Sequence, residues 1–136
     1  MFANNGVEFS NEWLFLREQW QHCREELRDI EQQIVDAEES GRSAELPKAR
    51  RDYLRRMQEI IDELHDETAH TSLERAIGAR LRRLQNSQMA LLQARGGRLS
   101  YSERYWDQEV DRQILNELLT RWQEWFKAAD DDAWAH

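Results

Sequence analysis

An unbroken seam of apolar residues runs through residues 13–37, and it restricts the fold more than any other feature of the sequence. Its members recur at alternating steps of three and four residues, which is the a/d pattern of a coiled-coil helix. They are Trp13, Leu16, Trp20, Cys23, Leu27, Ile30, Ile34 and Ala37. A helix with so narrow an apolar stripe must bury it against other helices. The rest of the chain is therefore expected to supply those helices.

Start and stop signals divide the chain into four predicted helices, at residues 11–39, 47–69, 72–95 and 101–128. For the first helix, Ser10 or Asn11 is a suitable N-cap, and Gly41 follows the end. Pro47 suits the first turn of the second helix, because a proline there loses no helical hydrogen bond. These signals predict helices of about 23 to 29 residues joined by short links.

Two more start signals have the capping-box spacing, in which Ser or Thr precedes Glu by three residues. Thr71 with Glu74 opens the third helix, and Ser100 with Glu103 opens the fourth. Four long helices with short links predict an all-α fold, namely an antiparallel four-helix bundle with a coiled-coil-like first helix. An extended hairpin that completes its core only in a dimer is the alternative architecture.

Each later helix has an apolar stripe that is wider than the first seam. The second helix offers Leu46, Tyr53, Leu54, Met57, Ile60, Ile61 and Leu64. The third offers Leu73, Ile77, Leu81, Leu84, Met89, Leu91 and Leu92. The fourth has the broadest face, with Trp106, Val110, Ile114, Leu115, Leu118, Leu119, Trp122, Trp125 and Phe126. A face that broad exceeds what a single neighbouring helix covers.

The length of 136 residues suits one domain with a single core. We expect a flexible N-terminal arm at residues 1–10, one helical-bundle domain at residues 11–128 and an acidic C-terminal tail at residues 129–136. Alternating helix directions would bring Trp13, Trp20, Trp122 and Trp125 to one pole of that bundle, with His65 and His70 nearby.

The formal net charge of −8 is unevenly distributed. Residues 48–98 carry 11 Lys and Arg against 7 Asp and Glu, whereas the segments on either side are acidic. Cys23 is the one cysteine and lies on the apolar seam, so it has no disulfide partner within the chain. There is no signal-peptide pattern and no apolar run long enough to span a membrane. These features predict a cytoplasmic protein.

No motif commits the chain to a reaction. His22 and Cys23 are adjacent on a helix and point about 100° apart, which is unsuitable for activating a thiol. Glu67 and His70 have the Glu-x-x-His spacing of di-iron bundles, but that chemistry needs two copies and two further glutamates. A metal-dependent oxidase assembled across a dimer is thus a remote alternative. We expect no enzymatic activity, no metal site and no cofactor.

The leading functional prediction is a non-enzymatic protein–protein interaction module, a small accessory or scaffold subunit. It would oligomerise with itself or dock on a larger complex through apolar surface left uncovered by the bundle. Tryptophan is enriched among the residues that dominate interface energies. The predicted interface anchors are Trp106, Trp125, Phe126 and Trp134.

The alternative prediction is contact with a nucleic-acid backbone through arginines of the second and third helices. These are Arg50, Arg51, Arg55, Arg56, Arg80, Arg82 and Arg83. Guanidinium groups bind phosphate bidentately, and Tyr53 offers a ring on which a base could stack. The competing expectation is that these arginines pair with acids on the first and fourth helices, including Glu26 and Glu31.

Overall fold

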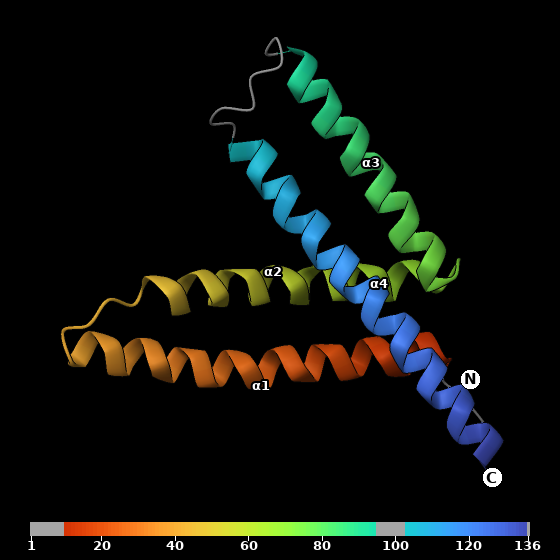
Figure 1. Ribbon diagram of the computed structural model, residues 1–136, viewed down its shortest axis with the longest axis horizontal. Coiled ribbons are helices and arrows are strands. Elements are labelled where there is room, and N and C mark those ends of the chain that lie inside the picture. Colours follow the sequence, from red (N-terminus) through yellow and green to blue (C-terminus); the bar gives the residue numbers. More distant parts are fainter. Residues whose placement is uncertain (1–9, 95–102, 136) are drawn as a thin grey trace. The chain divides into compact units, whose positions relative to one another are not determined.

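The computed structural model describes the backbone of residues 10–94 and 103–135, and the side chains of residues 10–93 and 104–129. Within these ranges the chain forms four α-helices and no strand. They are α1 (Asn11–Glu39), α2 (Glu45–Glu67), α3 (Leu73–Ala94) and α4 (Glu103–Ala135) (Figure 1). The all-α prediction is therefore confirmed.

The helices belong to two compact units, divided between Asp66 and Glu67. In the first unit α1 and α2 run antiparallel as a hairpin, and in the second α3 and α4 do the same (Figure 1). Closure of both hairpins into one four-helix bundle stays a prediction. So does the division of the chain into an arm, one domain and a tail, because residues 1–9 lie outside the described residues.

Both ends of α1 follow the sequence signals. Ser10 Oγ accepts a hydrogen bond from the backbone N–H of Trp13 at 3.1 Å, as expected of an N-cap. At the other end Gly41 has a φ of +69°, which glycine adopts without steric cost. Its N–H donates to Glu38 O, and Arg42 N–H donates to Ala37 O at 2.8 Å. This pair of bonds is a Schellman motif, which satisfies the last carbonyl groups of the helix.

The predicted start of α2 was wrong, because the helix begins at Glu45 rather than at Pro47. Its first intrahelical bond runs from Lys48 N–H to Ala44 O at 3.0 Å. Pro47 therefore occupies a first-turn position whose N–H would have no helical acceptor, so the proline is tolerated two residues further into the helix.

The joint between α2 and α3 also differs from the prediction. The α2 helix ends at Glu67, before the predicted residue 69. Ser72 caps α3 in place of Thr71, since Ser72 Oγ accepts a hydrogen bond from Arg75 N–H at 3.3 Å. The predicted capping residue of the fourth helix, Ser100, lies outside the described residues.

The α4 helix continues to Ala135, well beyond its predicted end at 128. The intervening sequence contains no glycine or proline that would stop a helix. The aspartates at 130–132 oppose the helix dipole there, but each costs only about 0.3–1 kcal/mol. The missing stop signal outweighs that penalty.

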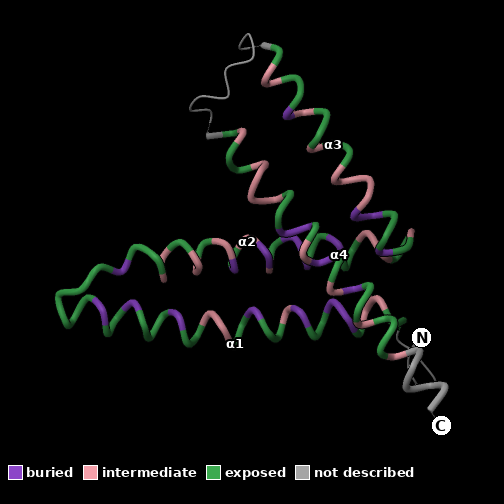
Figure 2. The backbone as a smooth tube through the Cα atoms, in the orientation of Figure 1, coloured by how far each residue is buried: buried purple, intermediate pink, exposed green. Residues whose placement is uncertain are grey.

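Buried residues occur along most of the length of the α1–α2 hairpin (Figure 2). On α1 the buried seam residues are Leu16, Cys23, Ile30, Ile34 and Ala37. They are matched on the second helix and its preceding turn by Ala44, Leu54, Met57, Ile60, Ile61 and Leu64. Leu46 departs from its predicted place in the stripe, because its side chain is 85% exposed. It lies in the first turn of α2, ahead of the buried stretch that begins at Leu54.

In the α3–α4 hairpin, fully buried apolar side chains occur at one end only. We call the end where α3 begins the base, and the end where α3 finishes and α4 begins (residues 84–94 and 103–111) the tip. The base holds the fully buried core, with Leu73, Ala76, Ile77, Ile114, Leu115, Leu118 and Trp122. At the tip Leu84, Leu91, Leu92 and Val110 are only partly covered, and the prediction that Met89 is buried was wrong.

Candidate protein-interaction surfaces

Among the described side chains of α4, two large aromatic ones are substantially exposed. Trp106 is 55% exposed, and Phe126 is 48% exposed. Both were predicted as interface anchors from the sequence. A third predicted anchor, Trp125, is partly buried, and the side chain of the fourth, Trp134, lies outside the described ones.

Around Phe126 the aromatic residues of α4 form a cluster. Trp122 and Trp125 stack with ring centroids 5.8 Å apart and an interplanar angle of 18°. Trp122 also meets Phe126 at a centroid distance of 5.4 Å. Residues three and four apart on a helix share a face, so the sequence spacing alone brings these rings together. The cluster is anchored by the buried Trp122 and leaves part of Phe126 in solvent.

At the tip of the α3–α4 hairpin, Trp106 lies level with Met89. The hydrogen bond from Gln108 Nε2 to Ser87 Oγ, at 2.7 Å, fixes the register of the two antiparallel helices. Two residues nearer the tip on each helix, Met89 of α3 and Trp106 of α4 come to the same level, but each points away from the facing helix because two residues turn a helix by about 200°. Met89 is 50% exposed. The Tyr105 ring supports Trp106 by an edge contact, with centroids 5.5 Å apart.

The tip also contains a buried polar layer. Gln88 is almost fully buried, and neither its Nε2 nor the Oε1 of Gln108 has a hydrogen-bond partner among the described residues. An unpaired buried polar group costs about 1–3 kcal/mol. The layer thus weakens the α3–α4 contact at the level where the large apolar side chains become exposed.

A cleft of about 410 Å³ lies between the N-terminal half of α1 and the C-terminal half of α2. Its lining comprises Trp13, Leu16, Arg17, Trp20, Gln21, Ile61, Asp62 and His65. The Trp13 and His65 rings are 6.2 Å apart, as an antiparallel pairing of these helices requires. Arg17 lies over the Trp13 ring at 5.3 Å, which is within the range of cation–π attraction.

The sequence predicted that Trp13, Trp20 and His65 lie near one another, chiefly as core packing and with a pocket as the alternative, and these three residues line the cleft. The available signal was the spacing of Trp13 and Trp20, which lie seven residues apart on the seam and so face the same side of α1. Trp122 and Trp125 were predicted to join these rings at one pole. They belong to the other hairpin, and that gathering stays a prediction.

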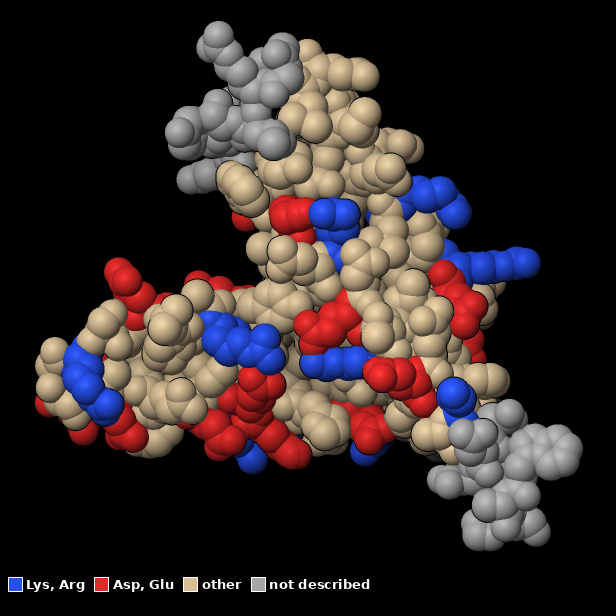
Figure 3. All heavy atoms as spheres, in the orientation of Figure 1, with Lys and Arg blue, Asp and Glu red and all other residues tan. Residues whose placement is uncertain are grey.

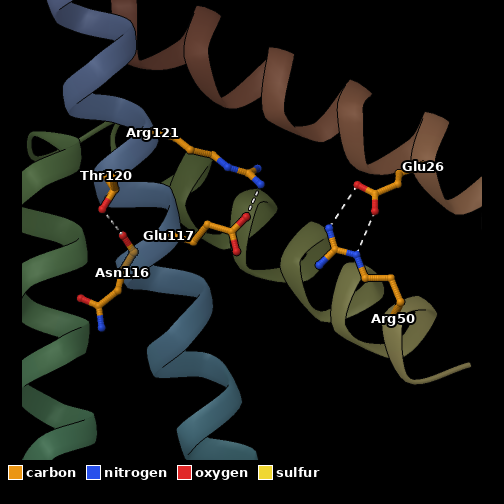
Figure 4. Close-up of polar contacts among 6 residues, drawn as sticks. All are labelled: Glu26, Arg50, Asn116, Glu117, Thr120 and Arg121. Carbon is orange, nitrogen blue, oxygen red and sulfur yellow. Dashed lines mark hydrogen bonds and ion pairs between the residues drawn. The ribbon is translucent and has the colours of Figure 1, made fainter. Parts of the chain in front are cut away.

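Two of the predicted phosphate-binding arginines pair with carboxylates across the α1–α2 hairpin. Arg50 donates from Nε to Glu26 at 2.8 Å and from a terminal nitrogen to the other carboxylate oxygen at 3.2 Å (Figure 4). Arg55 meets Glu31 at 3.2 Å. Both acids were among the partners expected for these side chains. Arg50 also lies over the Tyr53 ring at 5.3 Å, so one face of that ring is covered.

Of the other predicted phosphate-binding arginines, three form ion pairs with carboxylates and two form none among the described residues. Arg51 pairs with Asp52 and Arg56 with Glu59, both on α2, while Arg80 meets Glu67 at 2.6 Å. Arg82 and Arg83 on α3 are exposed and make no ion pair within the described part of the chain. Basic and acidic side chains are interspersed on the face shown in Figure 3.

Ion pairs along α4 form within the helix itself. Glu109 accepts hydrogen bonds from Arg112, the shortest at 2.6 Å, and chiefly through these bonds raises the pKa of Arg112 above its ordinary value. Arg121 pairs with Glu117 one turn away, and Thr120 donates to Asn116 O at 3.0 Å (Figure 4). These contacts stay on one helix, so they support α4 locally without joining it to a neighbour.

The Glu-x-x-His pair does not form a metal centre in the described residues. Glu67 is engaged by Arg80, and no three His, Cys, Asp or Glu side chains in the described ranges gather as a metal site. None of the described helices has the length and apolar character needed to cross a membrane.

No family model, curated protein or solved structure matches this chain. Its own geometry describes an all-α protein built from two helical hairpins. One hairpin carries partly exposed aromatic side chains, and the other carries an open cleft lined by two tryptophans.

Proposed function

We propose that this protein is a non-enzymatic protein–protein interaction module, a small helical accessory or scaffold subunit that docks through α4. The observation that carries the proposal is the exposure of Trp106 and Phe126 on that helix. Large aromatic side chains give much contact area for little loss of conformational freedom, and they dominate the binding energy of many interfaces.

The geometry around these residues supports binding rather than incidental exposure. Phe126 is held against the buried Trp122, and Trp106 is supported by Tyr105. An anchor that is already ordered loses less entropy when a partner binds. Both side chains should therefore lose little conformational entropy when a partner binds.

A protein partner is favoured over a nucleic acid because of the ion pairs on α2. Arg50 and Arg55 are each paired with a carboxylate of α1, so a phosphate would have to displace that acid. The buried thiol of Cys23, with no second cysteine in the sequence, fits the cytoplasm as the working compartment.

The test is photo-crosslinking in cells. A photoreactive phenylalanine analogue is placed at Trp106 or at Phe126, and the matched control carries it at Leu46, which is the most exposed large apolar residue among the described ones. We expect covalent protein adducts from the two α4 positions and not from Leu46. Adducts of twice the chain mass identify a second copy, and other masses identify a larger partner.

Equal labelling at all three positions, or no adduct at Trp106 and Phe126, would overturn the proposal. Circular dichroism of each purified variant confirms that the helical content is unchanged. This check removes misfolding as a cause of a missing adduct.

A further inference from the structure

We propose that the side of α3 turned away from its packed side is a docking surface for an acidic peptide segment of a partner protein. We call this side the outer face of α3, and it comprises Arg75, Ala79, Arg82, Arg83 and Asn86. The proposed function places docking on α4 and does not use this face. The inference therefore goes beyond the proposed function.

The outer face lies opposite the apolar side of α3. Arg75 and Arg82 are seven residues apart, so they lie about 20° apart round the helix and about 10.5 Å apart along it. The buried Ile77 follows Arg75 by two residues, and the partly buried Leu84 follows Arg82 by two, which places each about 200° away from its arginine. The two arginines thus form a row on the solvent side of the helix.

The outer face carries positive charge that the described part of the chain does not neutralise. Residues 75–93 include four arginines and no aspartate or glutamate, although 27 of the 136 residues are acidic. Arg80, the least exposed of the four, pairs with Glu67 at 2.6 Å. The other three are exposed and make no ion pair among the residues that the structure describes. Charge complementarity therefore selects an anionic partner.

Two features favour an acidic peptide over a nucleic acid. The sequence of α3 contains no aromatic residue, so it offers no ring on which a base could stack. A nucleic-acid strand would also continue past three guanidinium groups and bring further phosphates near α4, whose sequence has nine acidic against four basic residues. A peptide can place a few carboxylates on the arginines and end there.

The residues between and beside the arginines suit a peptide. Ala79 and Asn86 lie one turn before and one turn after Arg82, and both belong to the outer face. The small side chain of Ala79 leaves room for close approach, and the Asn86 amide can both donate to and accept from a peptide backbone. Guanidinium groups bind carboxylates bidentately, which gives the charged contacts a preferred geometry.

The experiment measures peptide binding to the full chain by fluorescence anisotropy. The probe is a labelled alanine-rich peptide that carries several glutamates, and the control peptide has glutamine at the same positions. A labelled single-stranded oligothymidine is the third probe. We expect the glutamate peptide to bind with an affinity that falls as salt rises, and the glutamine peptide not to bind.

Substitutions locate the contact. Replacing Arg82 and Arg83 with Gln should weaken binding of the glutamate peptide about tenfold. The matched control replaces Arg50 and Arg55 with Gln, and it should leave the affinity unchanged because both are already paired with carboxylates of α1. Circular dichroism confirms that both variants keep their helical content.

Three results would overturn the inference: no binding of the glutamate peptide, equal binding of the glutamine peptide, or equal weakening by the two variants. Tighter binding of the oligothymidine that is lost on replacing Arg82 and Arg83 would assign the face to a nucleic acid and overturn it as well. None of these results bears on crosslinking through Trp106 and Phe126, so the proposed function would still stand.

Discussion

The two hairpins share one architecture but differ in how far their contact is closed. In α1–α2 the buried residues extend from Ala37 and Ala44 beside the turn to Leu16 and Leu64 at the far end. In α3–α4 full burial of apolar side chains is confined to the base (Figure 2). The difference lies in the facing positions, which are mostly aliphatic in the first hairpin and include Ser87, Gln88 and Gln108 in the second. Antiparallel pairing alone does not enclose a core.

The largest expected difference is between two methionine-to-alanine substitutions, one in each hairpin. Met57 in the first hairpin is fully buried, and Met89 at the tip is half exposed. Met57→Ala should lower the free energy of unfolding by about 2–5 kcal/mol, because it removes buried methylene groups and leaves a cavity. Met89→Ala should cost less than about 1 kcal/mol in the monomer, since much of that side chain already contacts water. Urea unfolding at low protein concentration compares the two, and equal losses would show that the tip is as well packed as the first hairpin.

Gln88→Leu tests the polar layer. Removing a buried amide that lacks a partner should raise the free energy of unfolding by about 1 kcal/mol or more. Thermal unfolding measures the effect, and Gln85→Leu on the exposed side of α3 is the control. Destabilisation by Gln88→Leu would mean that the amide is satisfied in solution.

The N-cap serines of the two hairpins should contribute equally to the free energy of unfolding. Ser10 and Ser72 each accept a backbone N–H three residues ahead, at 3.1 and 3.3 Å. Ser→Ala at either position should therefore cost about 1 kcal/mol. Guanidinium unfolding of both variants checks this, with Ser40→Ala as the comparison. A much smaller loss at Ser72 would show that α3 begins elsewhere.

The smallest effect is expected for Arg50. Its ion pair with Glu26 is about half exposed, so Arg50→Gln should lower the free energy of unfolding by only about 0.2–1 kcal/mol, and less at high salt. A double-mutant cycle with Glu26→Gln isolates the pair. A coupling energy of several kcal/mol would show that the pair contributes more to stability than a half-exposed ion pair is expected to contribute.

Local signals predicted the first helix better than the rest of the fold. Ser10 and Gly41 mark the two ends of α1, and the seam between them is buried or half-buried throughout. Phe15 escaped prediction because it lies off the seam, although it is fully buried. Periodicity reveals which residues share a face, but it does not reveal how far that face extends round the helix.

The exposure of single residues could not be predicted because it depends on what lies opposite. Leu46 and Met89 have the right spacing for burial, yet both are exposed. Trp106 and Phe126 were proposed as anchors from residue type, and the structure shows them exposed without testing their role. The pairing of Arg50 and Arg55 with Glu26 and Glu31 was an open alternative, since no local pattern fixes the rotation of a helix against its neighbour.

The central claim is that apolar burial extends along the first hairpin but is confined to the base of the second. Amide hydrogen exchange of the full chain tests this directly. We predict slow exchange throughout the central part of α1 and α2 and at the base of the second hairpin, and faster exchange at residues 84–94 and 103–111. Exchange at the tip that is as slow as exchange at the base would contradict the account.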